Sequence, residues 1–207
     1  MINGVINIYK EKDYTSFDVV AKLRGILKQK KIGHTGTLDP NAEGVLLVCL
    51  GKATKLCDLL PDRDKTYRAT LLLGVETDTE DTTGQVLKES PVEVDEEQVI
   101  QVINSFVGNY MQTPPMYSAI KKDGVKLYEL ARQGIVIERE KRPVTIYNIK
   151  ILSMDLPRVT MEISCGKGTY IRSLCRDIGD KLGTGGCMDK LVRIRACGFD
   201  VKDSLTL

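Results

Sequence analysis

Residues 45–50, VLLVCL, are the stretch that most constrains how this chain can fold. All six side chains are apolar, so a strand formed there has no face suited to water. Six residues are far fewer than the roughly 20 apolar residues that a membrane-spanning helix needs. The stretch therefore predicts a buried strand inside a sheet.

Mixed patterns surround this stretch. Residues 65–74 alternate, with Tyr67 on the same face as three apolar side chains, which predicts a strand. Thr15 and Asp18 form a capping-box pattern before a helix that we expect to bury Phe17 and Val20. Further strands are expected at 144–152, 159–165 and 191–199, and further helices at 95–108, 127–132 and 169–182. Because strands and helices do not alternate regularly, we predict an α+β fold with a mixed, largely antiparallel sheet flanked by helices and loops.

The length of 207 residues suits a single catalytic domain over residues 1–207. Hydrophobic residues make up 42% and charged residues 28%, as in globular proteins. The start of the chain lacks the apolar core of a signal peptide, and no stretch is long enough to span a membrane. We therefore expect a cytoplasmic protein that has no membrane partner.

Cysteine and histidine usage argues against a metal centre. The six cysteines form no CxxC pair, and the chain has a single histidine, His34. Reduced, buried thiols are the commoner interpretation of such cysteines. We expect neither a metal site nor a redox site.

Charge is segregated along the chain although the net charge is only +2. Residues 1–56 carry nine basic and five acidic groups, residues 57–116 four and twelve, and residues 117–207 seventeen and eleven. Two basic flanks around an acidic middle fit a polyanion bound along part of the surface. Solvated faces that happen to segregate explain the charge pattern equally well.

The loop at residues 33–44, GHTGTLDPNAEG, is the most informative candidate for chemistry. Its three glycines permit unusual backbone angles and close approach of another chain. Pro40 moves Asp39 out of helical geometry, so the loop presents a carboxylate in a fixed conformation. An ordinary Asx turn before a strand is the competing interpretation.

Arg172 is the second candidate, because it is expected in the first turn of a helix, where the macrodipole disfavours a cation. A carboxylate from elsewhere in the chain would explain its presence, and exposure to solvent is the alternative. The preceding residues 166–169, GKGT, lack the GxxxxGK[ST] frame of a phosphate-binding loop. Tyr67, which lies near basic residues, suits either a base-stacking platform or the core.

Together these segments resemble one family, the TruB-type transfer-RNA pseudouridine synthases. Residues 31–40, KIGHTGTLDP, resemble the family's catalytic loop almost letter for letter. Residues 64–67 with 74–78 resemble its tyrosine strand and following loop. The motifs PPMYSA at 114–119 and GKGTYIR at 166–172 complete a set that lies in the family's order and covers nearly the whole chain.

The resemblance implies a role for each matching residue. Asp39 would be the catalytic nucleophile, Arg172 its ion-pair partner, and Tyr67 the ring that stacks on the target base. His34 matches a position that contacts the flipped-out region of the substrate. The remaining matches are Tyr170 and Leu191, which would line the uridine pocket, and Lys10, which would lie beside the catalytic loop.

The implied reaction converts uridine to pseudouridine at position 55, in the T loop of transfer RNA. It needs no redox change, so no cofactor and no metal are implied. The nucleotide must leave its stack before a carboxylate reaches it. Attack at C6 of the base and at C1′ of the sugar are both open. The partner would be the T arm of transfer RNA, and we expect a monomer.

Several features separate this chain from the family pattern. It ends at Leu207, about where many members continue into a small C-terminal RNA-binding domain, and the family's Lys-Pro-x-Gly reads KEKD at residues 10–13. Residues 121–142, with seven basic and four acidic groups, correspond to an insertion that closes over RNA. Two alternatives follow: an RNA-binding or RNA-chaperone module with weak or no turnover, and a guide-RNA-dependent synthase resembling dyskerin.

Overall fold

Two compact units make up the computed structural model, which describes residues 1–57, 59 and 64–207. The first unit combines Met1–Arg68 with Lys190–Leu207, and the second is Ala69–Asp189. The single catalytic domain expected from the sequence stays a prediction. Within the described residues, none of the helices has the length and apolar character needed to cross a membrane.

The first unit is built around β3 (Glu43–Leu50), whose residues 44–50 are all buried. β3 pairs antiparallel with β1 (Gly4–Lys10) along its length and with β2 (Ile32–His34), and it pairs parallel with β12 (Gly186–Ala196). The predicted buried strand is therefore confirmed. The unit also contains η1 (Gly51–Leu56), β13 (Phe199–Asp200) and η2 (Val201–Asp203).

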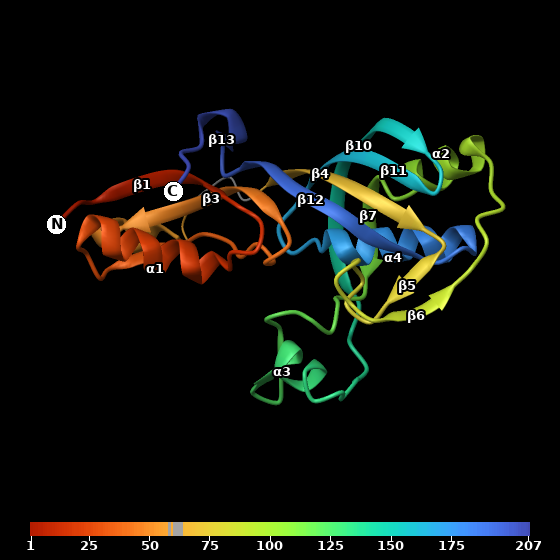
Figure 1. Ribbon diagram of the computed structural model, residues 1–207, viewed down its shortest axis with the longest axis horizontal. Coiled ribbons are helices and arrows are strands. Elements are labelled where there is room, and N and C mark those ends of the chain that lie inside the picture. The colour runs from red at the N-terminus through yellow and green to blue at the C-terminus, as the bar shows by residue number, and fades with distance from the viewer. Residues whose placement is uncertain (58, 60–63) are drawn as a thin grey trace. The chain divides into compact units, whose positions relative to one another are not determined.

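Helix α1 (Ser16–Leu27) lies along the β1 and β3 strands, as Figure 1 shows. The predicted capping box of Thr15 and Asp18 is present. Val19, Val20 and Leu23 pack into the core of this unit with side chains of β1, β2 and β3. The expected burial of Phe17 is wrong: it is 62% exposed, because the buried face follows the helical spacing 16, 19, 20 and 23.

The second unit holds most of the remaining strands. Strand β4 (Lys65–Leu73) begins in the first unit, and its alternation is confirmed, since Tyr67, Ala69, Leu71 and Leu73 are all buried. The other elements are β5 (Val75–Thr77), β6 (Val86–Glu89), α2 (Glu96–Asn104), β7 (Gly108–Gln112), β8 (Lys121–Lys122), β9 (Val125–Lys126), α3 (Leu127–Ala131), β10 (Arg142–Asp155), β11 (Arg158–Cys165) and α4 (Ile171–Leu182).

The strands follow the order β1-β3-β12-β4-β11-β10-β7 in a nine-stranded sheet that also includes β2 and β13. Strand β10 pairs antiparallel with both β11 and β7, and β12 pairs antiparallel with β13. The contact between β12 and β3 is parallel. The predicted α+β fold with a mixed, largely antiparallel sheet is confirmed.

Two segments pack more tightly than their sequences suggest. The acidic composition of residues 75–97 predicts a solvated connection, but Thr77, Glu80 and Asp81 are buried there, because hydrogen bonds satisfy their polar groups. The glycine-rich composition of residues 183–186 favours a flexible connection, but this turn is closely packed. A Cβ on Gly179 would lie 2.3 Å from the backbone carbon of Gly185, so helix α4 lies directly against this turn.

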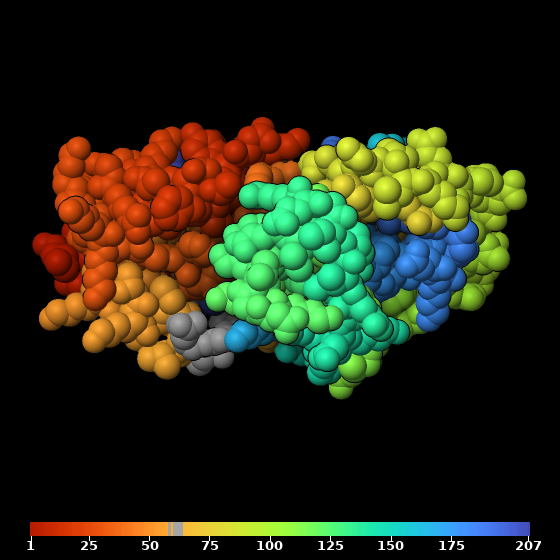
Figure 2. Space-filling model, turned by 90° about the horizontal axis from the view of Figure 1, so that it is seen from below, coloured from red at the N-terminus to blue at the C-terminus, as the bar shows by residue number. Residues whose placement is uncertain are grey.

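The segment from β8 to the start of β10 contains α3 and corresponds to the insertion predicted at 121–142. Figure 2 shows residues of this segment, in green to teal, as a continuous piece of the molecular surface. Lys126 and the guanidinium of Arg132 lie over the ring of Tyr128, at 5.3 and 5.2 Å from its centroid. The role of this insertion in closing over RNA stays a prediction.

Candidate active site

Asp39 lies in the loop between β2 and β3 of the first unit, and its side chain is half-buried. The backbone turns directly after it, where the N–H of Ala42 donates to the Asp39 carbonyl at 3.1 Å. The residues on both sides of Asp39 are held by side chains from other elements. The loop therefore fixes where this carboxylate stands.

Lys10, at the end of β1, holds the residue that follows Asp39. Its Nζ is fully buried and donates to the carbonyl oxygens of Pro40 at 3.1 Å, Tyr14 at 2.6 Å and Glu11 at 2.9 Å. Burial lowers the pKa of Lys10 to about 8, although the negative charge of Asp39 acts in the opposite direction. Lys10 is thus a buried cation beside the Asp39 loop.

Ser16 and Asp13 hold the same loop through short polar contacts. The N–H of Leu38 donates to Ser16 Oγ at 2.9 Å, and this hydroxyl donates back to the Leu38 carbonyl at 3.2 Å. The N–H of Asp13 donates to the Pro40 carbonyl at 2.8 Å. Asp13 has φ of 68° at the position where the resemblance leads us to expect glycine. Aspartate tolerates this left-handed region, so the entry loop keeps a glycine-like conformation.

Arg193, on β12, reaches the other side of the loop. Its side chain is 1% exposed and donates to the carbonyls of Val45 at 2.7 Å, Gly36 at 3.1 Å and Thr37 at 3.4 Å. The backbone of β12 also runs close to Gly44, where a Cβ would lie 2.3 Å from the Arg193 carbonyl oxygen. Of the three loop glycines, Gly44 alone has a positive φ, at 101°. The expectation of unusual backbone angles is therefore right for Gly44 and wrong for Gly33 and Gly36.

His34 ends β2 next to the loop and is partly buried. Burial lowers its pKa, and the positive charge of Arg193 lowers it further, so the imidazole is neutral at physiological pH. Its Nδ1 is buried and has no hydrogen-bond partner among the residues that the structure describes. A ring nitrogen in that state is available to a polar group of a bound ligand.

Tyr67 and Leu191 belong to the first unit as well, on β4 and β12. Tyr67 is 7% exposed and Leu191 is 8% exposed. Tyr67 shares the buried face of β4, whereas Leu191 lies two residues before Arg193 on β12. Both side chains are therefore buried on strands of the first unit.

Arg172 lies in the first turn of α4 in the second unit, where the sequence predicts it. It is 5% exposed, which excludes the alternative that it simply extends into solvent. Its guanidinium donates to the carbonyls of Tyr117 at 2.8 Å and Thr79 at 3.0 Å, and its Nε lies 4.0 Å from an Asp81 carboxylate oxygen. The ion pair predicted between Arg172 and Asp39 stays a prediction.

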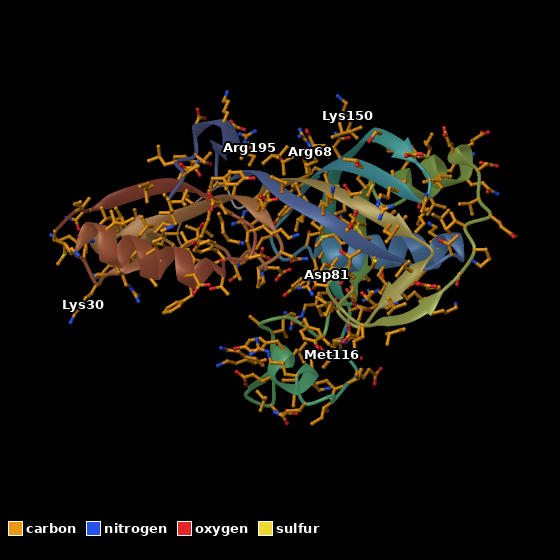
Figure 3. The ribbon with its side chains drawn as sticks, in the orientation of Figure 1. Lys30, Arg68, Asp81, Met116, Lys150 and Arg195 are labelled. Atoms are coloured by element: carbon orange, nitrogen blue, oxygen red, sulfur yellow. The ribbon has the colours of Figure 1, made fainter. Side chains whose placement is uncertain are left out.

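The loop between β5 and β6 supports Arg172, and Figure 3 labels Asp81 within it. Asp81 accepts hydrogen bonds from the hydroxyls of Thr79 at 2.8 Å and Thr83 at 2.5 Å. The neighbouring Glu80 accepts one from Ser173 at 2.6 Å and forms an ion pair with Arg176. Helix α4 is therefore tied to this loop at the residue that follows Arg172 and one turn further on.

Tyr170 precedes α4 and is held by a single amide side chain. Gln112, which is 1% exposed, accepts from the Tyr170 N–H at 2.9 Å and donates to the Tyr170 carbonyl at 3.0 Å. The side chain of Tyr170 remains partly exposed. The second unit thus fixes Tyr170 and Arg172 together at the start of one helix.

Comparison with family models decides the classification. Residues 24–171 match the model described as TruB family pseudouridylate synthase (N terminal domain), and residues 172–207 match the model for the tRNA pseudouridylate synthase B C-terminal domain. The chain belongs to the TruB family. The members of this family are pseudouridine synthases, which are isomerases.

Curated relatives agree with this assignment. The TruB-family chain is 60% identical over 214 residues to the tRNA pseudouridine synthase B of Lachnoclostridium phytofermentans, and 53% identical over 207 residues to that of Clostridium tetani. The matches cover 100% of this chain, and 70% and 72% of the respective relatives. The resemblance found in the sequence is thus confirmed.

Solved structures support the fold. A chain in a Cbf5-Nop10-Gar1 complex matches with a TM-score of 0.77 at 34% identity, covering 99% of this chain and 52% of its own. A chain from an H/ACA RNP bound to a substrate RNA containing 2′-deoxyuridine matches with a TM-score of 0.73 at 31% identity, covering 98% and 50%. The TruB-family chain spans about half the length of each of these proteins.

Within each unit, the structure places two of the residues that the sequence singled out at one element or loop. Lys10 and His34 flank the Asp39 loop in the first unit, and Tyr170 precedes Arg172 in the second. Sequence reasoning missed Arg193, Ser16 and Gln112. The sequence did carry a signal for Arg193. It shares a strand face with Leu191, and a charged side chain is uncommon on a buried strand face unless it has a specific partner or role.

Across the described ranges, no group of three or more His, Cys, Asp or Glu side chains is arranged to hold a metal ion. Cys49, Cys165, Cys175 and Cys187 are buried and reduced. Burial raises the pKa of Cys49 to about 12 and that of Cys187 to about 11, so these thiols stay protonated. The expectation of reduced, buried thiols is confirmed for these residues.

Proposed function

We propose that this TruB-family enzyme converts the T-loop uridine of transfer RNA to pseudouridine, with Asp39 as the nucleophile. The observation that carries the proposal is the loop around Asp39, whose backbone is held on both sides by Lys10, Ser16 and Arg193. A carboxylate fixed in this way loses little freedom when it reaches its transition-state position. The cytoplasmic location expected from the sequence remains part of this proposal, because its substrate is transfer RNA.

The reaction breaks the N1–C1′ glycosidic bond and forms a C5–C1′ bond after the uracil has turned. The proton at C5 leaves, and one proton is taken up at N1, so atoms balance without an oxidant or a second substrate. The carboxylate of Asp39 attaches transiently to the substrate and is released at the end. Attack at C6 and attack at C1′ both satisfy this balance.

The other residues take roles that match their surroundings. Arg172 takes the role of ion-pair partner of Asp39 that the resemblance implies, because a carboxylate removed from water without such a partner is costly. Tyr67 stacks on the target base, while Tyr170 and Leu191 line its pocket. His34 is neutral and has an unsatisfied Nδ1, so it is able to meet a polar group of the extruded nucleotide or its neighbours.

The test uses an unmodified transfer-RNA transcript whose uridines carry tritium at C5. Pseudouridine formation releases this label into water, and the modified position is then mapped by primer extension after carbodiimide treatment. We expect release from the T loop by the unaltered protein and none by Asp39→Asn. Asp203→Asn is the matched control, since Asp203 is an exposed aspartate of the same unit.

The alternatives predict different outcomes. Binding of the transcript without label release would overturn the proposal in favour of an RNA-binding or chaperone module. A requirement for added guide RNA would favour a synthase that acts on guided substrates. Label release at a position outside the T loop would keep the isomerase and refute the choice of target. Size-exclusion chromatography tests the expected monomeric state, which predicts elution with a size standard of the monomer's mass.

A further inference from the structure

Arg193 is a buried cation that neither the sequence motifs nor the proposed chemistry uses. Its partners within the described part of the chain are backbone carbonyls, and it forms no ion pair there. Removing an arginine from water costs several kcal/mol unless its donors are satisfied. An apolar side chain would fill a buried strand position at lower cost, so the guanidinium calls for an explanation.

The three carbonyls lie at both ends of the Asp39 loop. Gly36 and Thr37 precede Asp39 by three and two residues, and Val45 is the third residue of the buried strand β3 that follows the loop. A single rigid guanidinium therefore bridges the entry and the exit of the loop. The β12 backbone adds to this, because Arg193 and Val192 pair in parallel with Gly44 and Glu43.

The remaining constraints act on the centre of the loop. Ser16 holds Leu38, and Lys10 together with the Asp13 backbone holds Pro40. These groups come from β1, α1 and the turn between them, which all precede the loop in the chain. Arg193 supplies the side-chain restraint that comes from β12. Without it, residues 36 and 37 lose their side-chain anchor, and the path into Asp39 is free to move.

We propose that Arg193 is a positioning residue that sets the Asp39 carboxylate for the isomerisation, acting through the carbonyls of Gly36 and Thr37. This inference rests on the proposed function, since it assigns Arg193 to the same nucleophile. Arg193 does not touch the reacting atoms. A displacement of about 1 Å at a reacting group reduces turnover by about a hundred-fold.

The experiment compares Arg193→Lys and Arg193→Met with the unaltered protein. Lysine keeps the charge, but its single nitrogen cannot reproduce the fork of the guanidinium. We expect kcat of Arg193→Lys to fall about ten- to a hundred-fold, with the Kd for the transcript within about three-fold of the original value. We expect a larger fall in kcat for Arg193→Met. Arg195→Met is the matched control, because Arg195 lies on the same strand, is exposed and is labelled in Figure 3.

A second readout does not depend on activity. The chain has one histidine, so the ring protons of His34 give a single assignable signal in a proton NMR titration. The charge of Arg193 contributes to the lowered pKa of His34. Arg193→Met should therefore raise the pKa of His34, whereas Arg193→Lys and Arg195→Met should change it less.

The outcomes separate this inference from the proposed function. If the unaltered protein forms no pseudouridine, the proposed function fails, and the His34 titration still tests whether the cation lies beside the loop. If the unaltered protein is active and both Arg193 variants keep its kcat, the positioning role is refuted. If kcat falls only in proportion to the folded fraction measured by circular dichroism, Arg193 has a merely structural role, and the positioning role is also refuted.

Discussion

Raising the pH from 7 to 9 tests whether the ammonium group of Lys10 holds the Asp39 loop in its active form. Lys10 has a pKa of about 8, and its three donors meet three carbonyls, including that of Pro40. The free amine has one N–H fewer, so one carbonyl loses its donor when Lys10 deprotonates. The neutral amine also removes a positive charge from the neighbourhood of Asp39.

The size of the effect follows from the titration. At pH 7 about nine-tenths of the molecules carry the ammonium, and at pH 9 about one-tenth do, since each pH unit changes the ratio ten-fold. If only the ammonium form is active, the single-turnover rate falls about ten-fold across this range. Burial is the main cause of the lowered pKa of Lys10, and the positive charge of Arg193 lowers it further, whereas the negative charges of Asp39, Glu43 and Asp13 act in the opposite direction.

Stability should move in the opposite direction. The folded-state pKa of Lys10, about 8, lies below the ordinary value of 10.5, so between these values the unfolded chain binds more protons. The free energy of unfolding contributed by Lys10 therefore rises with pH from about 8 to 10.5 and is constant below this window. Unfolding through Lys10 thus cannot explain a loss of activity at pH 9.

The assay measures the rate of tritium release with enzyme in excess over transcript, from pH 6.5 to 9.5, together with the melting temperature at each pH. Lys10→Arg stays charged and Lys10→Met never carries a charge. Any pH dependence that these variants show therefore comes from titration of the substrate or of other residues. We expect Lys10→Arg to show no decline between pH 7 and 9, and Lys10→Met, which lacks the ammonium group, to be slow across the whole range. A flat profile for the unaltered protein, or the same decline in both variants, would refute the reasoning.

Three further predictions concern single substitutions. Gly44→Ala should lower the free energy of unfolding by more than about 4 kcal/mol in urea titrations, because the new Cβ would lie 2.3 Å from the carbonyl oxygen of Arg193. Gly36→Ala is the control: its Cβ would have its nearest neighbours at 3.7 Å, so the free energy of unfolding should change by less than about 1 kcal/mol. Arg172→Ala should reduce kcat by at least about a hundred-fold while filter binding shows most of the RNA affinity retained, because it removes a carboxylate's partner and not a phosphate contact; proportional loss of both would contradict this. Thr15→Ala should cost about 1 kcal/mol in thermal unfolding through loss of the α1 cap, with kcat unchanged.

Local patterns predicted most elements of the fold, because burial and capping act over a few residues. The apolar stretch of β3, the alternation of β4 and the capping box of α1 each depend on neighbours within one element. The prediction for Phe17 was wrong because α1 buries only one of its faces. Ser16 is buried at the start of that face instead, because its hydroxyl accepts a hydrogen bond from Leu38 of the Asp39 loop.

Acidic composition misled the prediction for residues 75–97. Carboxylates are usually solvated, so a segment rich in them suggests an exposed connection. Glu80 and Asp81 are buried instead because donors from α4 and from their own turn satisfy them. Two of those donors, Ser173 and Arg176, lie more than 90 residues from Glu80 in the sequence. A local sequence pattern cannot indicate a contact over such a separation.

The candidate site shows the same division between local and distant information. The motif around Asp39 marks the nucleophile, but the geometry of the loop depends on Arg193, which is 156 and 157 positions away from the carbonyls that it holds. Closing so long a loop costs conformational entropy, which the parallel pairing of β12 with β3 and the burial of β3 offset. The pairing of β12 with β3 thus also fixes the position of the Asp39 loop, because Gly44 and Arg193 are register partners in it.

A substitution that weakens the pairing of β12 with β3 must change both stability and turnover. One that weakens the packing of α1 through Val19 or Leu23, which belong to the hydrophobic core of the first unit, should lower stability first.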